Sequence, residues 1–179
     1  MGNATTTEGA MHAFLYSGSK MTDLGTLGGT YSIANAINDR GQVVGNATTT
    51  EGAVHAFLYS GSKMTDLGTL GGTNSYAGGI NNSGQVVGAA FTAGVHNLRP
   101  FLYDGSTLID LNTLIDPHSD CILGSAYDIN DSGQILGVGI NGSGQTHAFI
   151  LTPVPEPSTL TLLGISIVGL LAYAWRKRQ

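Results

Sequence analysis

The stretch "HAFLYSGSKMTDLGTLGGT" at His12–Thr30 recurs without change at His55–Thr73. It belongs to a longer repeat, because residues 2–44 align without gaps to residues 45–87, with a period of 43 and only seven differences. A third, diverged copy includes Pro100–Leu114 and Ala126–Gly137, and a fourth covers only His147–Leu151. Periods of about 40 to 50 residues are typical of propellers and solenoids, so the repeat decides the fold class.

Each period predicts four short strands separated by turn signals. In the second and third copies these strands are "SYAGGI", "QVVGAAFT", "HAFLYS" and "MTDLGTL". Corners such as "NNSG" supply Asx side chains and a glycine that accepts positive φ. "HAFLY" and "QVV" are apolar on both faces, as in strands covered on both sides. We therefore predict an all-β fold of repeated four-stranded antiparallel units, partial and β-propeller-like, in which no unit can bury its own faces.

Composition and charge exclude several classes of protein. Glycine is abundant at 27 residues and only 11% of residues are charged, which favours strands and turns over long helices. Residues 1–153 hold eleven acidic and four basic residues, a net charge of −7, so nucleic-acid binding is not expected. The single cysteine, Cys121, excludes an intramolecular disulfide and is expected to be a small core residue.

The repeated stretch, together with "INDRGQVVG", is similar to the HAF repeat of extracellular bacterial proteins, named for His-Ala-Phe. The resemblance covers nearly all of residues 2–151 and implies an exported protein. The third copy departs from it, with Arg99-Pro100-Phe101 in place of His-Ala-Phe and an insertion at Asp116–Cys121.

The sequence begins in mid-repeat, because Met1 takes the place that Val44 has in the next copy. No signal peptide is recognisable in this sequence. We expect Met1 to be a misassigned start, with upstream units and a signal peptide missing from the sequence. The alternative is a short chain of which two copies complete one ring.

The composition changes after residue 151, and four segments are predicted: a β domain at 1–151, a Pro-rich linker at 152–159, a transmembrane helix at 160–175 and a basic cytoplasmic tail at 176–179. The segment "LTLLGISIVGLLAYAW" (Leu160–Trp175) is uncharged and near the lower length limit for a span. Arg176, Lys177 and Arg178 would stay cytoplasmic and leave the repeats outside the inner membrane.

This tail resembles the PEP-CTERM sorting signal, which has Val-Pro-Glu-Pro, an apolar span and a basic cluster in this order. The resemblance implies processing by exosortase, a membrane transpeptidase of Gram-negative bacteria that make exopolysaccharide. It makes Pro155, Glu156 and Pro157 the recognised residues. The protein would then reach the cell surface or the medium.

The recurring polar residues are candidate site residues. His12, His55 and His147 recur once per unit, as do Asp23, Asp66 and Asp110. Equivalent positions lie around a ring rather than converging, so a structural role at strand starts and turns is favoured over a shared metal or sugar site. His96 and His118 are predicted in loops. We predict no catalytic residue, no metal and no cofactor.

Three functions remain open at this stage. The favoured one is a non-enzymatic surface or matrix-associated protein whose units bind exopolysaccharide or other surface proteins. The second is a glycan-active propeller enzyme, which needs paired acids at the ring centre. The third is a truncated gene fragment without independent function.

Overall fold

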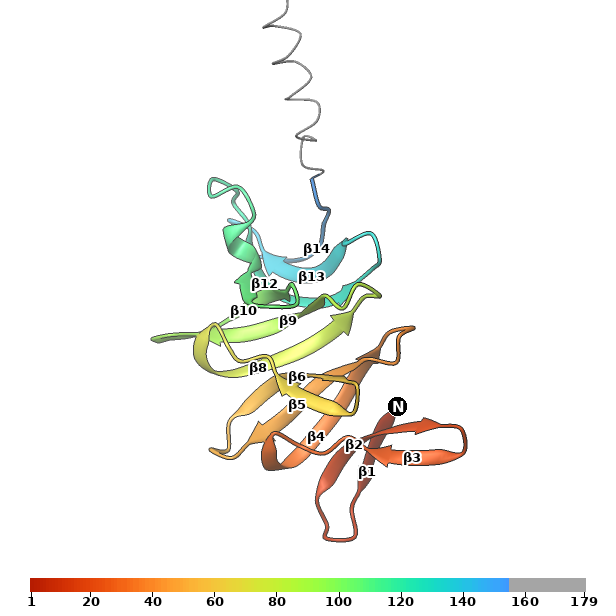
Figure 1. The fold of residues 1–179 in the computed structure, drawn as a ribbon. Coiled ribbons are helices and arrows are strands. Elements are labelled where there is room, and N and C mark those ends of the chain that lie inside the picture. The colour runs from red at the N-terminus through yellow and green to blue at the C-terminus, as the bar shows by residue number, and fades with distance from the viewer. Residues whose placement is uncertain (155–179) are drawn as a thin grey trace, which may run out of the picture.

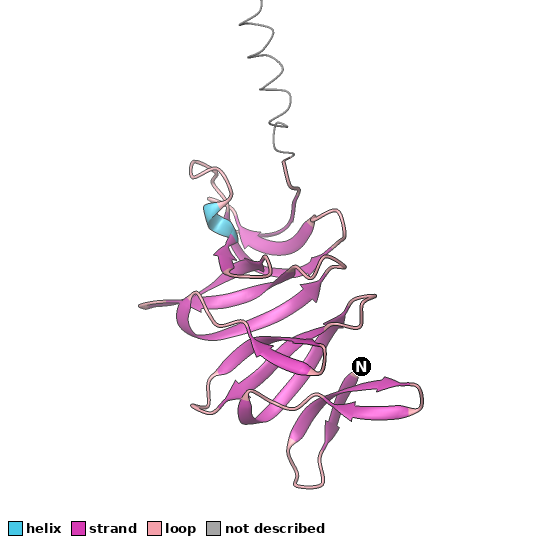
Figure 2. Ribbon diagram, viewed as in Figure 1, coloured by secondary structure: helices cyan, strands magenta, loops and turns pink. Residues whose placement is uncertain are grey.

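The computed structural model describes residues 1–154, and these residues form a stack of antiparallel β-units (Figures 1 and 2). Unit 1 consists of β1 (Gly2–Thr5), β2 (Met11–Ser17) and β3 (Lys20–Asp23). Unit 2 consists of β4 (Gly28–Ile37), β5 (Val43–Thr49), β6 (Val54–Ser60) and β7 (Lys63–Asp66). Unit 3 consists of β8 (Gly71–Ile80), β9 (Val86–Thr92), β10 (Val95–Tyr103) and β11 (Leu108–Asp110). Unit 4 consists of β12 (Ile122–Ile129), β13 (Ile135–Ile140) and β14 (Thr146–Leu151).

Strands that follow one another within a unit pair antiparallel, in the orders β1-β2-β3, β4-β5-β6-β7, β8-β9-β10-β11 and β12-β13-β14. A parallel bridge between Met11 and Tyr31 connects units 1 and 2, so these two units count as one seven-stranded sheet. The prediction of an all-β fold built from short antiparallel units is confirmed.

The predicted strand boundaries are mostly correct. The repeated nineteen residues contain β2 without its first residue, β3 and the first residues of β4 in one copy, and the same parts of β6, β7 and β8 in the next. Two details are wrong. The strand expected over "MTDLGTL" ends already at the aspartate, where the chain turns, and His96 lies within β10 rather than in a loop. His118 lies in a loop, as predicted, and a 3₁₀ helix (Leu111–Thr113) precedes this loop.

The Asn-x-x-Gly-Gln corners fold as predicted. The Oδ1 atom of Asn81 accepts hydrogen bonds from the backbone N–H groups of Ser83 and Gln85, and its Nδ2 donates to Gln85 Oε1 at 2.8 Å. Gly84 adopts a φ of +85°, which a residue with a Cβ rarely takes. The asparagine side chain therefore replaces the backbone partners that the corner lacks.

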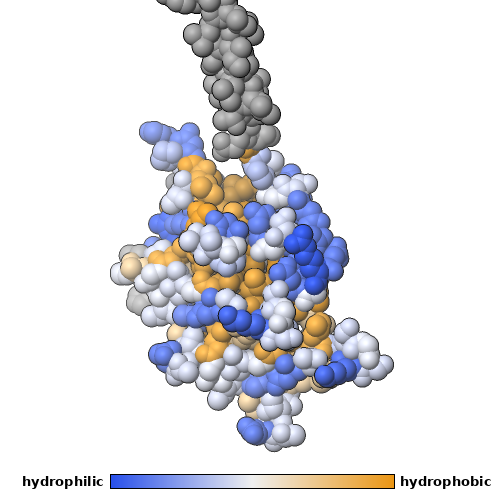
Figure 3. All heavy atoms as spheres, viewed as in Figure 1, coloured by the Kyte–Doolittle hydropathy of each residue, from blue (hydrophilic) through white to orange (hydrophobic). Residues whose placement is uncertain are grey.

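Successive units bury apolar residues between them in three cores. The core between units 2 and 3 contains Val44, Val86 and Phe101, each 0% exposed. Similar cores lie between units 1 and 2 and between units 3 and 4. Neighbouring residues of one strand pack into different cores: Val43 into the core between units 1 and 2, and Val44 into the core between units 2 and 3. This is the two-sided burial expected of strands that are apolar on both faces, and in Figure 3 apolar residues show between polar ones along the stack.

The predicted linker, sorting motif, transmembrane helix and basic tail lie outside the described residues, apart from residues 152–154. The last described strand, β14, ends at Leu151. Within residues 1–154 no helix has the length and apolar character needed to cross a membrane.

Candidate functional site

The recurring histidines and aspartates form pairs, one per unit in units 1 and 2. His55 Nδ1 lies 2.8 Å from Asp66 Oδ2, and His12 Nδ1 lies 2.8 Å from Asp23 Oδ2. The histidine stands near the start of β2 or β6, and the aspartate ends β3 or β7, the strand that pairs with it. The pairing therefore follows from the hairpin itself.

The second carboxylate oxygen of each aspartate fixes the turn that follows. Asp66 Oδ1 accepts from Gly68 N–H at 2.7 Å, and Asp23 Oδ1 accepts from Gly25 N–H at 2.8 Å. Partial burial raises the pKa of Asp23, but the hydrogen bond from Gly25 and the contact with His12 outweigh it, so the pKa of this carboxyl is lowered. The aspartate is thus held as an anion that ties a strand end to a turn.

The third unit has a different basic side chain beside its aspartate. Arg99 occupies the histidine position, and its Nη1 lies 3.8 Å from Asp110 Oδ2. Asp110 Oδ1 accepts from Asn112 N–H at 2.9 Å and caps the 3₁₀ helix. A basic side chain therefore stands beside the strand-end carboxylate in all three units, but in unit 3 an ion pair at 3.8 Å replaces the hydrogen bond at 2.8 Å.

The remaining sequence candidates do not join these pairs. His147 has no aspartate partner within residues 1–154, and its Nε2 lies 3.2 Å from Asn141 Nδ2. His118 lies in the predicted loop beside Asp116 and is exposed. Cys121 is half-buried. No group of three or more His, Cys, Asp or Glu side chains in residues 1–154 is arranged to hold a metal ion.

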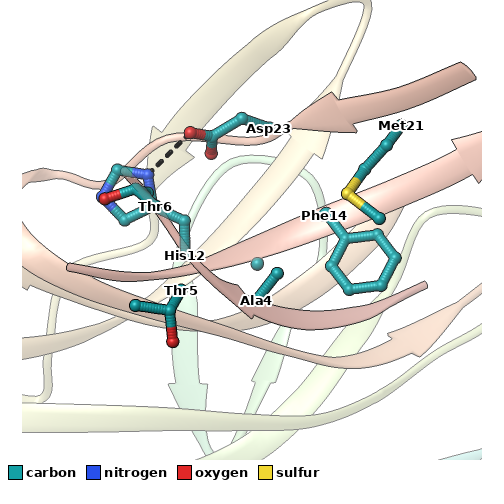
Figure 4. A pocket seen from close by; sticks show the side chains of 8 residues that line it. Ala4, Thr5, Thr6, His12, Phe14, Met21 and Asp23 are labelled. Carbon is teal, nitrogen blue, oxygen red and sulfur yellow. Dashed lines mark hydrogen bonds and ion pairs between the residues drawn. The ribbon is translucent and has the colours of Figure 1, made fainter. Parts of the chain in front are cut away.

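The His12–Asp23 pair borders a shallow hollow of about 240 Å³ on unit 1 (Figure 4). Phe14 and Met21 form its apolar wall, and Thr5 and Thr6 contribute hydroxyl groups. The hollow contains one carboxylate, that of Asp23, and one imidazole, that of His12, and these two groups are hydrogen-bonded to each other. It can accommodate a small apolar group, and it lacks the second carboxylate that glycoside hydrolysis needs.

A larger groove of about 690 Å³ lies between units 3 and 4, where the chain leaves the sheets. Leu102, Leu111, Ile129 and Leu151 line it with apolar side chains, and Pro153 lies at its border. The residues just before the sorting segment therefore run beside the last inter-unit core.

The repeat pattern did not single out the polar residues that join one unit to the next. Asn46 in β5 is 8% exposed, and its Oδ1 accepts from Ala77 N–H in β8 at 2.9 Å. Ser75, 0% exposed, accepts from Ala56 N–H at 2.9 Å. Asn46 and Ser75 are matched by Asn3 and Ser32 in the first copy. Because nearly all residues of the two copies are identical, this identity does not distinguish them from the other repeated residues.

The corners between the first and second strands of units 2, 3 and 4 also form a hydrogen-bonded row. Asn82 lies in the middle, and its Nδ2 donates to Asp39 Oδ2 at 2.7 Å and to Asp131 Oδ2 at 3.0 Å. Asn38 Nδ2 donates to the Asn81 carbonyl oxygen at 3.0 Å, which reinforces the same junction. The polar groups at these corners therefore lock neighbouring units in register.

Comparison with known families matches residues 28–150 to the family described as "Protein of unknown function (DUF3466)". The chain belongs to the DUF3466 family. The match covers most of the stack, from the start of β4 to the penultimate residue of β14. It does not test the HAF-repeat resemblance, which stays an interpretation of the motif. No curated protein and no solved structure matches the chain.

A second match assigns residues 153–179 of this DUF3466 protein to the PEP-CTERM protein-sorting motif. This confirms the sorting signal predicted from Pro155–Pro157, the apolar segment and the basic cluster. A PEP-CTERM signal marks an exported protein that exosortase processes, with a location at the cell surface or outside the cell. It does not establish what the stacked units bind.

Proposed function

We propose that this chain is a non-enzymatic surface or extracellular-matrix-associated protein, whose stacked units form an incomplete β-propeller that presents its loops to exopolysaccharide or to other surface proteins. The sorting match supports the location. The repeated units support the binding or structural role, because repeat stacks offer extended surfaces rather than one specialised cleft.

One observation carries the proposal: the recurring polar side chains are used in holding the stack together. Asp66 binds His55 and a turn N–H, Asn46 binds the next unit, and Asn82 links two neighbouring corners. A catalytic carboxylate needs a free oxygen to meet its substrate, whereas both oxygens of Asp66 are occupied. Groups committed in this way favour a scaffold.

The sorting segment follows the stack closely. β14 ends at Leu151, so only residues 152–154 separate it from Pro155. At about 3.3–3.6 Å per extended residue, the motif begins within roughly 14 Å of the last strand. We infer that exosortase meets Pro155, Glu156 and Pro157 with the folded stack directly beside it, while residues 160–175 hold the motif at the outer boundary of the inner membrane.

Replacement of Glu156 tests this role of the tail. Glu156→Gln in the full-length chain should leave the protein in the inner-membrane fraction, because it removes the charge between the two prolines. Glu8→Gln, in the exposed β1–β2 turn, is the matched control and should be exported normally. Export of the Glu156→Gln protein at the wild-type level would contradict the proposal.

The binding role has its own test. Full-length protein is incubated with exopolysaccharide from a bacterium that carries exosortase, and both co-sedimentation and the release of reducing ends are measured. Co-sedimentation without new reducing ends is expected. Release of reducing ends would instead identify a glycan-active enzyme.

A further inference from the structure

The outer face of unit 1 exposes side chains that are covered at the same positions of the other units. Tyr16 and Met21 are 60% and 56% exposed. One period later, Tyr59 and Met64 pack against the core between units 1 and 2. In the third copy, Tyr103 and Leu108 pack against the core between units 2 and 3. These positions therefore form the face that each unit turns toward the unit before it.

The outer face of unit 4 exposes the opposite set of positions. Leu136 is 46% exposed, whereas Val44 and Val87, at the same position of units 2 and 3, are 0% exposed. Ile150 is 68% exposed, whereas Leu58 and Leu102 pack against the cores that follow their units. These positions form the face that each unit turns toward the unit after it.

The two ends of the stack are therefore different and complementary. Inside the chain, a face of the unit 4 kind meets a face of the unit 1 kind at every junction, and each junction buries an apolar core. Within residues 1–154 nothing covers either end. The surface that fits each end is thus one that the chain itself carries at its other end.

We propose that copies of this chain associate head to tail, with the outer face of unit 4 in one copy against the outer face of unit 1 in the next. Such a heterologous contact leads to a ring or to a filament, depending on the rotation between copies. The interface extends the internal junctions and is apolar at its centre. It does not depend on the ligand proposed above, and it takes up the alternative in which copies of the chain complete one another rather than the expectation of missing upstream units.

Two glutamate variants test the proposal in the full-length chain in maltoside micelles, with protein mass measured by analytical ultracentrifugation. Wild type should form dimers or larger assemblies. Tyr16→Glu and Ile150→Glu should each weaken association by about tenfold or more, because each places a carboxylate in the apolar contact. Both positions are exposed, so both variants should fold.

Mixing gives the sharpest result. A Tyr16→Glu chain keeps an intact unit 4 face, and an Ile150→Glu chain keeps an intact unit 1 face, so an equimolar mixture should form dimers and nothing larger. Leu114→Glu is the matched control, since Leu114 is 60% exposed but lies beside the groove between units 3 and 4, and it should assemble like wild type. A monomeric wild type, a variant that assembles like wild type, or a mixture without dimers would each overturn the proposal. If the copies associated through residues 160–175 instead, both glutamate variants would assemble like wild type, and the proposal would be overturned.

Discussion

Asn46 Oδ1 accepts a hydrogen bond from the backbone N–H of Ala77 at 2.9 Å, and this contact joins β5 of unit 2 to β8 of unit 3. The same repeat position, Asn3, bonds Ala34 N–H at 3.1 Å across the junction of units 1 and 2, but in an exposed setting. The same hydrogen bond is thus buried at one junction and exposed at the other. Removing the asparagine at each position compares how much a buried and an exposed bond stabilise the stack.

Asn46→Ala should lower the free energy of unfolding by about 1–3 kcal/mol, because it leaves the Ala77 N–H buried without a partner. Asn3→Ala should cost clearly less, since water can replace the lost acceptor. Urea unfolding of the full-length chain followed by far-UV circular dichroism measures both. If both variants lost the same free energy of unfolding, the hydrogen bond between units 2 and 3 would not be better shielded from water than the one between units 1 and 2.

Asn82 separates two carboxylates, those of Asp39 and Asp131, and donates to both. Asn82→Asp replaces that donor with a third carboxylate, so we expect a lower Tm at low salt and recovery of part of the loss at high salt. Ser83→Asp adds the same charge to the same corner without removing the donor, and it should change Tm less. A loss that is independent of salt would contradict this explanation.

Gly88 in β9 permits the neighbouring strands β8 and β10 to approach closely. A Cβ at this position would collide with the Tyr76 carbonyl oxygen and would lie 2.9 Å from the Phe101 ring. Gly88→Ala should therefore destabilise the protein by about 1–3 kcal/mol through overpacking. Gly124→Ala is the control in β12, because its Cβ would meet only the Val138 carbonyl oxygen at 3.4 Å. Thermal unfolding of both variants checks the difference.

The lowered pKa of Asp23 predicts a pH-dependent contribution to stability. A carboxyl whose pKa is lower in the folded state stabilises that state at pH values above its unfolded pKa of about 3.9, and the contribution is lost as the pH falls through the folded value. The stability difference between wild type and Asp23→Asn should therefore shrink as the pH falls from about 5 toward 3. The effect is small, since the Asp23 side chain is 55% exposed. A difference that grows between about pH 5 and pH 3 would contradict the assignment.

Sequence alone predicted the strands and turns well, because the repeat, the Asn-x-x-Gly-Gln corners and the two-sided apolar strands are local signals. It favoured structural roles for the recurring histidines and for the recurring aspartates, but it did not predict that His12 pairs with Asp23 and His55 with Asp66. It could not identify the roles of Asn46, Ser75 and Asn82. Their partners lie in other strands or other units, and the two nearly identical copies hide which shared residues matter.

The central claim is that the β-stack is exported from the cell and that its C-terminal tail is cleaved off. The most direct test is the mass of the protein recovered outside cells that contain exosortase. We predict that this protein retains the four units but lacks the apolar segment at 160–175. In cultures of cells without exosortase, no such processed protein should be recovered. Recovery of the full-length mass outside the cell, or of the processed species without exosortase, would contradict the account.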